Sequence, residues 1–123
     1  MSEHGEIRAQ LSNTLVALMK EHYGKGPTAA KSFINDEYVV TVLEDGLTRN
    51  EQTMLDAGEE ELVRGYRLRF QQAIREEMCG AVERITGRRV LDYHSQIVFE
   101  PPRSFEIFVL ESPPDGAVSD DSR

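Results

Sequence analysis

The stretch AAKSFINDEYVVTVL, residues 29–43, decides the fold of this chain. It holds two runs rich in β-branched and aromatic residues, and between them lie Asn35 and Asp36, which tolerate the positive φ angles of a tight turn. This pattern predicts a β-hairpin. Two further runs, RVLDYHSQIVF and SFEIFVLE, are separated by a loop that contains Pro101 and Pro102, and they predict a second hairpin.

One strand of each hairpin is apolar on both of its faces. The apolar residues are Tyr38, Val39, Val40, Val42 and Leu43 in the first hairpin, and Phe105, Ile107, Phe108, Val109 and Leu110 in the second. Because side chains alternate between the faces of a strand, both faces of the sheet need cover. If a long helix covers one face, the other needs the N-terminal helix or a second copy of the protein. We therefore predict a homodimer.

Helical patterns account for most of the remaining chain. Apolar residues recur at spacings of three and four over Glu6–Tyr23, and Gly24 then stands where helices commonly end in a left-handed residue. Thr48 and Glu51 have the capping-box spacing, which predicts the start of a short helix. A sustained apolar stripe over residues 58–87 predicts one long helix.

The order of elements predicts the α+β class. We expect a four-stranded, largely antiparallel sheet of two hairpins, packed with an N-terminal helix, a short helix and one long helix. A chain of 123 residues is the usual size of one domain, which we place at residues 1–111. Residues 112–123, SPPDGAVSDDSR, are small, acidic and proline-containing, and we expect them to form a disordered tail.

Composition excludes several classes of function. The chain carries 14 basic and 22 acidic residues, and its net charge of -8 repels phosphate backbones, so we expect no nucleic-acid partner. Its apolar runs are far shorter than the ~20 residues that span a bilayer, so we expect no direct membrane insertion. A single cysteine, Cys79, cannot form a disulfide within the chain, and the N-terminal residues lack a signal-peptide pattern. We expect a cytoplasmic protein.

The segment HYGKGPT, residues 22–28, resembles part of a phosphate-binding loop. A Walker loop leads into a helix N-terminus, whereas these glycines follow a helix, where the dipole end is negative. We therefore interpret the segment as a helix stop and a turn. The alternative is an anion or partner contact through Lys25 and Thr28.

Other candidate residues do not form a recognised catalytic set. His4, His22 and His94 are scattered, and no spacing of His or Cys indicates a metal site, so we expect no metal ion and no cofactor. In LDYHS, Asp92 and His94 could share a strand face while Ser95 could not, which argues against a catalytic triad. Arg67 lies at the edge of the apolar stripe, where it could reach a buried carboxylate or a ligand.

Several short motifs together resemble a known family. They are GKGP at residues 24–27, LT-x-x-E at 47–51, Leu62-Val63 with Arg67, TGR-x-V at 86–90 and FVLE at 108–111. In this combination the chain resembles the MpsC-like proteins of Na+-translocating, membrane potential-generating systems. The resemblance implies a soluble component associated with a sodium or inorganic-carbon transport system, and it implies no known catalytic site. Between the last two strands the chain departs from the family pattern, so a contact made by that loop can differ here.

These observations favour a non-enzymatic accessory or regulatory domain that binds a protein partner, such as a membrane transporter subunit, or a small ligand. The alternative is a small enzyme or anion-binding domain that uses Lys25, Arg67 and His94, and it predicts a pocket where those side chains converge. A third hypothesis, a structural assembly module, predicts a large apolar interface without a pocket.

Overall fold

A computed structural model describes residues 3–112, so the predicted tail lies outside the described residues from position 113 onward. Within these residues, four helices and four strands follow one another. They are α1 (Glu3–Tyr23), β1 (Ala29–Asn35), β2 (Tyr38–Glu44), α2 (Arg49–Asp56), α3 (Glu60–Ala73), α4 (Arg75–Thr86), β3 (Val90–Phe99) and β4 (Pro102–Leu110).

The four strands form one sheet in the order β1-β2-β4-β3, and every neighbouring pair is antiparallel. The predicted α+β class with two hairpins is therefore confirmed. In the first hairpin Asn35 pairs with Tyr38, so the turn residues are Asp36 and Glu37, one position later than the sequence suggested. Asp36 takes the positive φ of 56° that this short connection requires.

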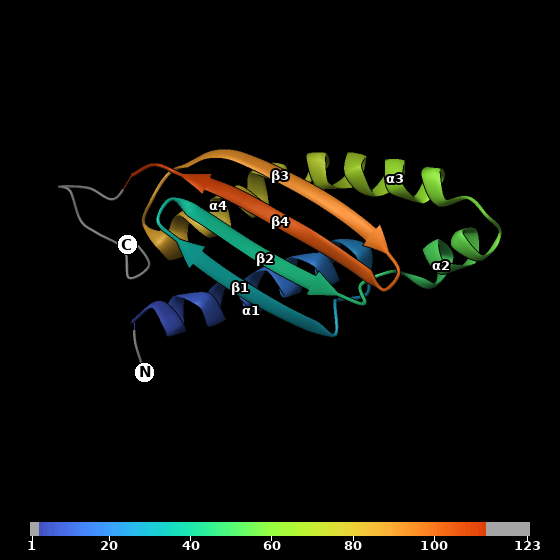
Figure 1. Ribbon diagram of the computed structural model, residues 1–123, viewed down its shortest axis with the longest axis horizontal. Coiled ribbons are helices and arrows are strands. Elements are labelled where there is room, and N and C mark those ends of the chain that lie inside the picture. The colour runs from blue at the N-terminus through green and yellow to red at the C-terminus, as the bar shows by residue number, and fades with distance from the viewer. Residues whose placement is uncertain (1–2, 113–123) are drawn as a thin grey trace.

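All of the main helical packing lies on one face of the sheet. Figure 1 shows α1 and α4 behind the four strands, and their apolar side chains meet the inward-facing residues of β1, β2, β3 and β4 in one core. Its buried members are Leu11, Leu15, Met19, Ile34, Val39, Leu43, Ile74, Met78, Val82, Tyr93, Phe108 and Leu110. Because α1 shares this face with α4, it leaves the opposite face without cover.

The expected long helix is divided at Ile74, whose φ of -102° and ψ of 13° depart from helical values. The amide of Ile74 still donates to Phe70, and its carbonyl accepts from Met78, so α3 and α4 follow one another closely. The division lets the two helices serve different cores. Ile74 and α4 enter the main core, whereas Val63 of α3 packs with Leu47 and Ile97 in a smaller cluster.

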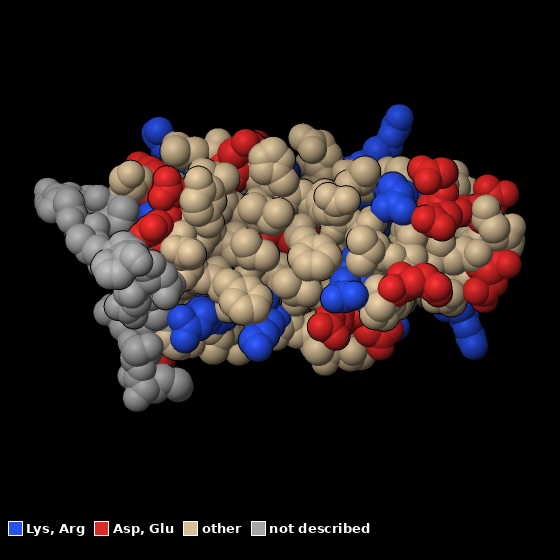
Figure 2. All heavy atoms as spheres, viewed as in Figure 1, with Lys and Arg blue, Asp and Glu red and all other residues tan. Residues whose placement is uncertain are grey.

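The opposite face of the sheet is apolar, and no described helix or strand covers it. Phe33 and Tyr38 are about half exposed there, at 48% and 49%. Strand register places Phe33, Val40 and Ile107 in one row across the sheet, with His94 at its end. We call this surface the open sheet face. Its apolar residues are Phe33, Tyr38, Val40, Val42, Val98, Phe105, Ile107 and Val109. Figure 2 shows the uncharged surface at the middle of this view, with charges mainly around it.

No helix within residues 3–112 has the length and apolar character needed to cross a membrane.

Helix ends in this part of the chain follow local sequence rules. Gly24 closes α1 with a φ of 83°, and its amide donates to the carbonyl of Lys20 at 2.9 Å. The predicted stop and turn after the first helix is confirmed.

Two glycine substitutions should change stability in opposite directions. Gly24→Ala should lower the free energy of unfolding by about 1 kcal/mol, because a Cβ disfavours left-handed backbone. Gly65→Ala should raise it by roughly 0.5–1 kcal/mol, because Gly65 lies inside α3 and a Cβ there meets nothing within 4 Å. Urea denaturation of both variants measures the difference. Equal effects of the two substitutions would contradict this account of the helix end.

Candidate functional site

A groove of about 500 Å³ lies where the end of α1 meets α2 and α3. Nine residues line it: His22, Tyr23, Thr48, Asn50, Glu51, Met54, Leu62, Val63 and Tyr66. Leu62 and Tyr66 stand one turn apart on α3 and are 56% and 51% exposed. The groove therefore combines an apolar wall with a few polar groups, as ligand and peptide sites commonly do.

Tyr23 is held rigidly in this groove by two neighbours. Its ring stacks on Phe70 with centroids 4.1 Å apart, and the guanidinium of Arg67 lies 4.0 Å from the ring centroid. The phenol oxygen is buried and has no hydrogen-bond partner among the described residues. Burial raises the pKa of Tyr23 far above its ordinary value, although Arg67 opposes this. Tyr23 is thus a neutral donor whose hydrogen bond is unused.

Arg67 is occupied by a buried carboxylate. Its Nε donates to Oε2 of Glu51 at 2.8 Å, its Nη2 donates to Oε1 at 2.6 Å, and Nη2 also donates to the carbonyl of Gly46 at 2.7 Å. Both side chains are about 6% exposed. The sequence left open whether Arg67 reaches a buried carboxylate or a ligand, and in the structure it binds a buried carboxylate.

Glu51 joins this ion pair to the predicted capping box, which is confirmed. Thr48 Oγ1 accepts from the amide of Glu51 at 3.2 Å, and the amide of Thr48 donates to Glu51 Oε1 at 2.9 Å. Burial alone would raise the pKa of Glu51, but hydrogen bonds from Arg67 and Thr48 outweigh burial and lower it. The same carboxylate therefore starts α2 and fixes α3 against it.

A second buried carboxylate lies in the sheet. Glu106 of β4 faces the helices and accepts hydrogen bonds from the hydroxyls of Tyr93 and Ser95 and, at 3.4 Å, from the amide of Gln71. Burial raises its pKa, and the hydrogen bonds from neighbouring hydroxyls reduce that effect. This site was missed at the sequence level. The available signal was a glutamate on the same strand face as the core residues Phe108 and Leu110.

Glu106 belongs to a polar row that crosses the inner face of the sheet. Register places Ser32, Thr41, Glu106 and Ser95 side by side on the four strands. Hydrogen bonds of 2.8 Å continue the row from Thr41 through Ser32 to Ser12 of α1. These groups satisfy one another inside the protein, so we assign the row a structural role.

Lys25 and Thr28 are brought together by one carboxylate. Lys25 Nζ lies 3.8 Å from Asp45 Oδ1, and Thr28 Oγ1 donates to Asp45 Oδ2 at 3.3 Å. These contacts tie the turn after α1 to the end of β2. An anion or partner contact through Lys25 and Thr28 stays a prediction.

His94 lies apart from them, on the open sheet face. It is 62% exposed, and its Nε2 is 2.9 Å from Asp92 Oδ2. Ser95 instead points to the inner face, where it donates to Glu106. The prediction that Asp92 and His94 share a face without Ser95 is confirmed.

Cys79 is half-buried, and burial raises the pKa of its thiol, which disfavours the nucleophilic thiolate.

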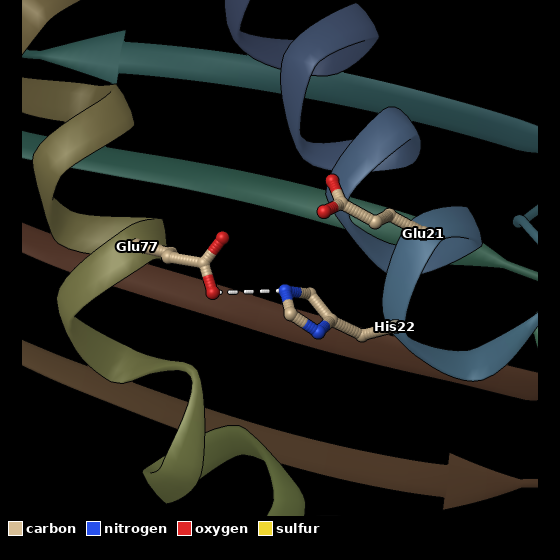
Figure 3. A group of neighbouring side chains, drawn as sticks. All are labelled: Glu21, His22 and Glu77. Carbon is tan, nitrogen blue, oxygen red and sulfur yellow. Dashed lines mark ion pairs between the residues drawn. The ribbon is translucent and has the colours of Figure 1, made fainter.

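Figure 3 shows three side chains, where α1 meets α4, that could hold a metal ion. Glu21, His22 and Glu77 offer ligand atoms within 4.8 Å of one another. His22 Nε2 lies 2.9 Å from Glu77 Oε1, while both glutamates are exposed. The contact between His22 and Glu77 links α1 and α4 directly, so the cluster also has a structural explanation as a contact between two helices.

Breaking the ion pair at Arg67 should strongly destabilise the fold. Arg67→Met should lower the free energy of unfolding by about 3–5 kcal/mol, because it leaves the Glu51 carboxylate buried without its cation. The double variant Glu51→Leu, Arg67→Met should recover much of this loss, since both charges are then absent. Chemical denaturation measures both values. A single variant as stable as the wild type would contradict the prediction.

The pair also predicts a pH dependence. The pKa of Glu51 is lowered on folding, so its stabilisation is complete above the ordinary value of 4.5 and is lost as pH falls through the folded pKa. This acid-dependent loss should be absent in the double variant. Unfolding free energies measured at successive pH values below 5 distinguish the two proteins.

Glu106 should make the free energy of unfolding depend on pH in the direction opposite to Glu51. Its pKa is raised on folding, so its contribution is complete below 4.5 and is lost as pH rises through the folded pKa. Glu106→Gln should remove this decline, which denaturation from pH 4.5 to about 8 measures. An unchanged slope in the variant would show that Glu106 is ionised throughout this range.

Comparison with known proteins identifies a family. The family model described as Na+-translocating membrane potential-generating system (MpsC) matches residues 3–112. No curated protein and no solved structure matches the chain. The match covers both the groove and the open sheet face.

Proposed function

Because the chain belongs to the MpsC family of Na+-translocating, membrane potential-generating systems, we propose that it is a non-enzymatic accessory or regulatory domain of such a system. It acts in the cytoplasm by binding another protein, and it works as a homodimer. The family description supports the link to transport. The open sheet face carries the proposal, because its apolar side chains are contiguous across the sheet and no described helix or strand covers them.

The open sheet face is large enough for its burial to contribute to the free energy of association. Four strands ~4.8 Å apart and about seven residues long, with a rise of ~3.3 Å per residue, give a face of roughly 400 Å². Patches of several hundred Å² on a monomer are commonly functional. A stable interface buries about 800 Å² per partner, so we expect a dimer that dissociates at low concentration.

A second copy is the occupant that fits this face best. Two sheets that pack in an aligned sandwich can be related by a two-fold axis parallel to their strands, which places β1 of one copy over β3 of the other. The β1 edge carries Lys31 and the β3 edge carries Asp92, both exposed. Register places Lys31 level with Gln96 and Asp92 level with Asn35, so the edges of the two copies would meet through polar side chains while the apolar middle rows are buried.

Placing a charge on this face should separate the copies. Ile107→Glu puts a carboxylate at the middle of the apolar row and should raise the dimer dissociation constant at least about tenfold, since it leaves a charge unpaired in the interface. Leu68→Glu is the matched control, because Leu68 is 42% exposed on α3 and is not part of the open sheet face. Sedimentation and light scattering measure the association.

Phe33→Glu provides a second variant, because the half-exposed Phe33 tolerates substitution with less cost to folding. Circular dichroism establishes that each variant is folded. A wild-type protein that stays strictly monomeric across micromolar concentrations removes the dimer from the proposal.

The binding function has its own test. A tagged protein expressed in its native host should retain an untagged membrane subunit of the transport system after detergent extraction. Turnover of a substrate by the purified protein would defeat the proposal and favour the enzyme alternative. That alternative requires Lys25, Arg67 and His94 to act together. Their placement supports the binding hypothesis instead, since Arg67 is buried with Glu51 and His94 lies exposed on β3.

A further inference from the structure

The groove between α1, α2 and α3 is distinct from the open sheet face. Met54, Leu62, Val63 and Tyr66 make its apolar wall, and Leu62 and Tyr66 extend that wall into solvent. Two exposed side chains one helical turn apart match the spacing with which an amphipathic helix presents its anchors. A surface of this shape suits an extended apolar stripe better than a small enclosed ligand.

Charge around the groove favours a basic occupant. Glu59, Glu60 and Glu61 are exposed at the start of α3, immediately before Leu62. Glu21 and Glu77 lie beside His22 at the α1 end. Figure 2 shows acidic side chains gathered over the end of the molecule where α2 and the start of α3 lie.

The nearby arginines do not cancel the negative charge around the groove. Arg67, beneath the groove, is neutralised by Glu51, and Arg64 is paired with Glu60 at 2.8 Å. Arg49, beside the lining residue Asn50, and Arg69, three residues after Tyr66 on α3, are exposed cations, and the exposed glutamates around the groove outnumber them. An anionic ligand is therefore disfavoured, while lysine or arginine side chains at the ends of a bound segment would find carboxylates.

The unused hydroxyl of Tyr23 supplies a specific contact. Its ring is fixed between Arg67 and Phe70, and its oxygen is buried with no described partner while Tyr23 lines the groove. A buried donor without an acceptor costs free energy, and an acceptor brought by a bound molecule would remove that cost.

From these contacts we propose that the groove binds an amphipathic helical segment of a protein partner, with an apolar stripe flanked by lysine or arginine. The apolar stripe packs on Leu62, Tyr66 and Met54, the basic flanks face the glutamates, and a polar group of the segment accepts from Tyr23. This inference rests on the protein-binding function proposed above, and it does not depend on the dimer.

The probe is a synthetic peptide of about 18 residues, long enough to form a helix, with leucine at helical spacing and lysine on its flanks. A fluorescein label allows its binding to the full chain to be followed by anisotropy. Leu62→Lys should weaken binding at least about tenfold, because it removes an anchor and adds a like charge. Leu68→Lys makes the same change on α3 outside the groove, and it should alter binding less than about twofold.

Tyr23→Phe tests the specific contact. It removes a hydroxyl that has no described partner, so the fold should keep its stability, while affinity for the peptide should fall by about two- to tenfold. Chemical-shift mapping should place the peptide on α2, α3 and the end of α1. A peptide with glutamate in place of lysine should bind much more weakly.

Three results would overturn the inference: equal binding by Leu62→Lys and Leu68→Lys, shifts confined to the open sheet face, or no difference between lysine and glutamate peptides. Each leaves the proposed function standing if the wild-type protein still retains the membrane subunit. If Leu62→Lys retains that subunit as well as the wild type does, the groove is not the partner site. If the wild type retains none, the proposed function fails.

Discussion

The bidentate pair between Arg67 and Glu51 joins segments that are far apart in the chain. Glu51 starts α2 through its capping box with Thr48, and Arg67 brings α3 to it while also holding the carbonyl of Gly46 after β2. The guanidinium then supports the Tyr23 ring at the end of α1. Because buried charges tolerate little displacement from one another, this pair fixes the geometry of the groove.

The sheet distributes polarity between its faces in an unusual way. Its inner face contains a hydrogen-bonded row of Ser32, Thr41, Glu106 and Ser95, although that face is buried by helices. Its outer face carries an apolar row made by Phe33, Val40 and Ile107. Apolar residues therefore lie on both faces of the sheet, and the proposed dimer would cover the outer one.

The two surfaces can operate independently. The open sheet face lies on the side away from α1 and α4, while the groove is built from helices at one end of the molecule. Self-association through the sheet would leave both grooves of a dimer available. Such an arrangement would suit the accessory role proposed above, because two weak contacts with one complex would combine into a stronger attachment.

Local patterns in the sequence determined the elements and most of their ends. Alternation of apolar residues defined both hairpins, Gly24 ended α1, and Thr48 with Glu51 began α2, since each depends on neighbouring backbone and side-chain groups. The family was also recognisable from short motifs. The division of the long helix at Ile74 could not be predicted, because the apolar stripe continues through this residue. The two cores that require the division form only when the helices pack.

Tertiary structure alone decided which partners the functional side chains meet. The sequence left Arg67 between a carboxylate and a ligand, and the choice of Glu51 depends on how α2 and α3 pack, 16 residues apart in the chain. The unpartnered Tyr23 hydroxyl and the placement of α1 beside α4 also arise from packing. The sequence of each strand thus determined which residues lie on each face of the sheet. The helices determined which face stayed open, because only three-dimensional packing assigns a helix to a side of the sheet.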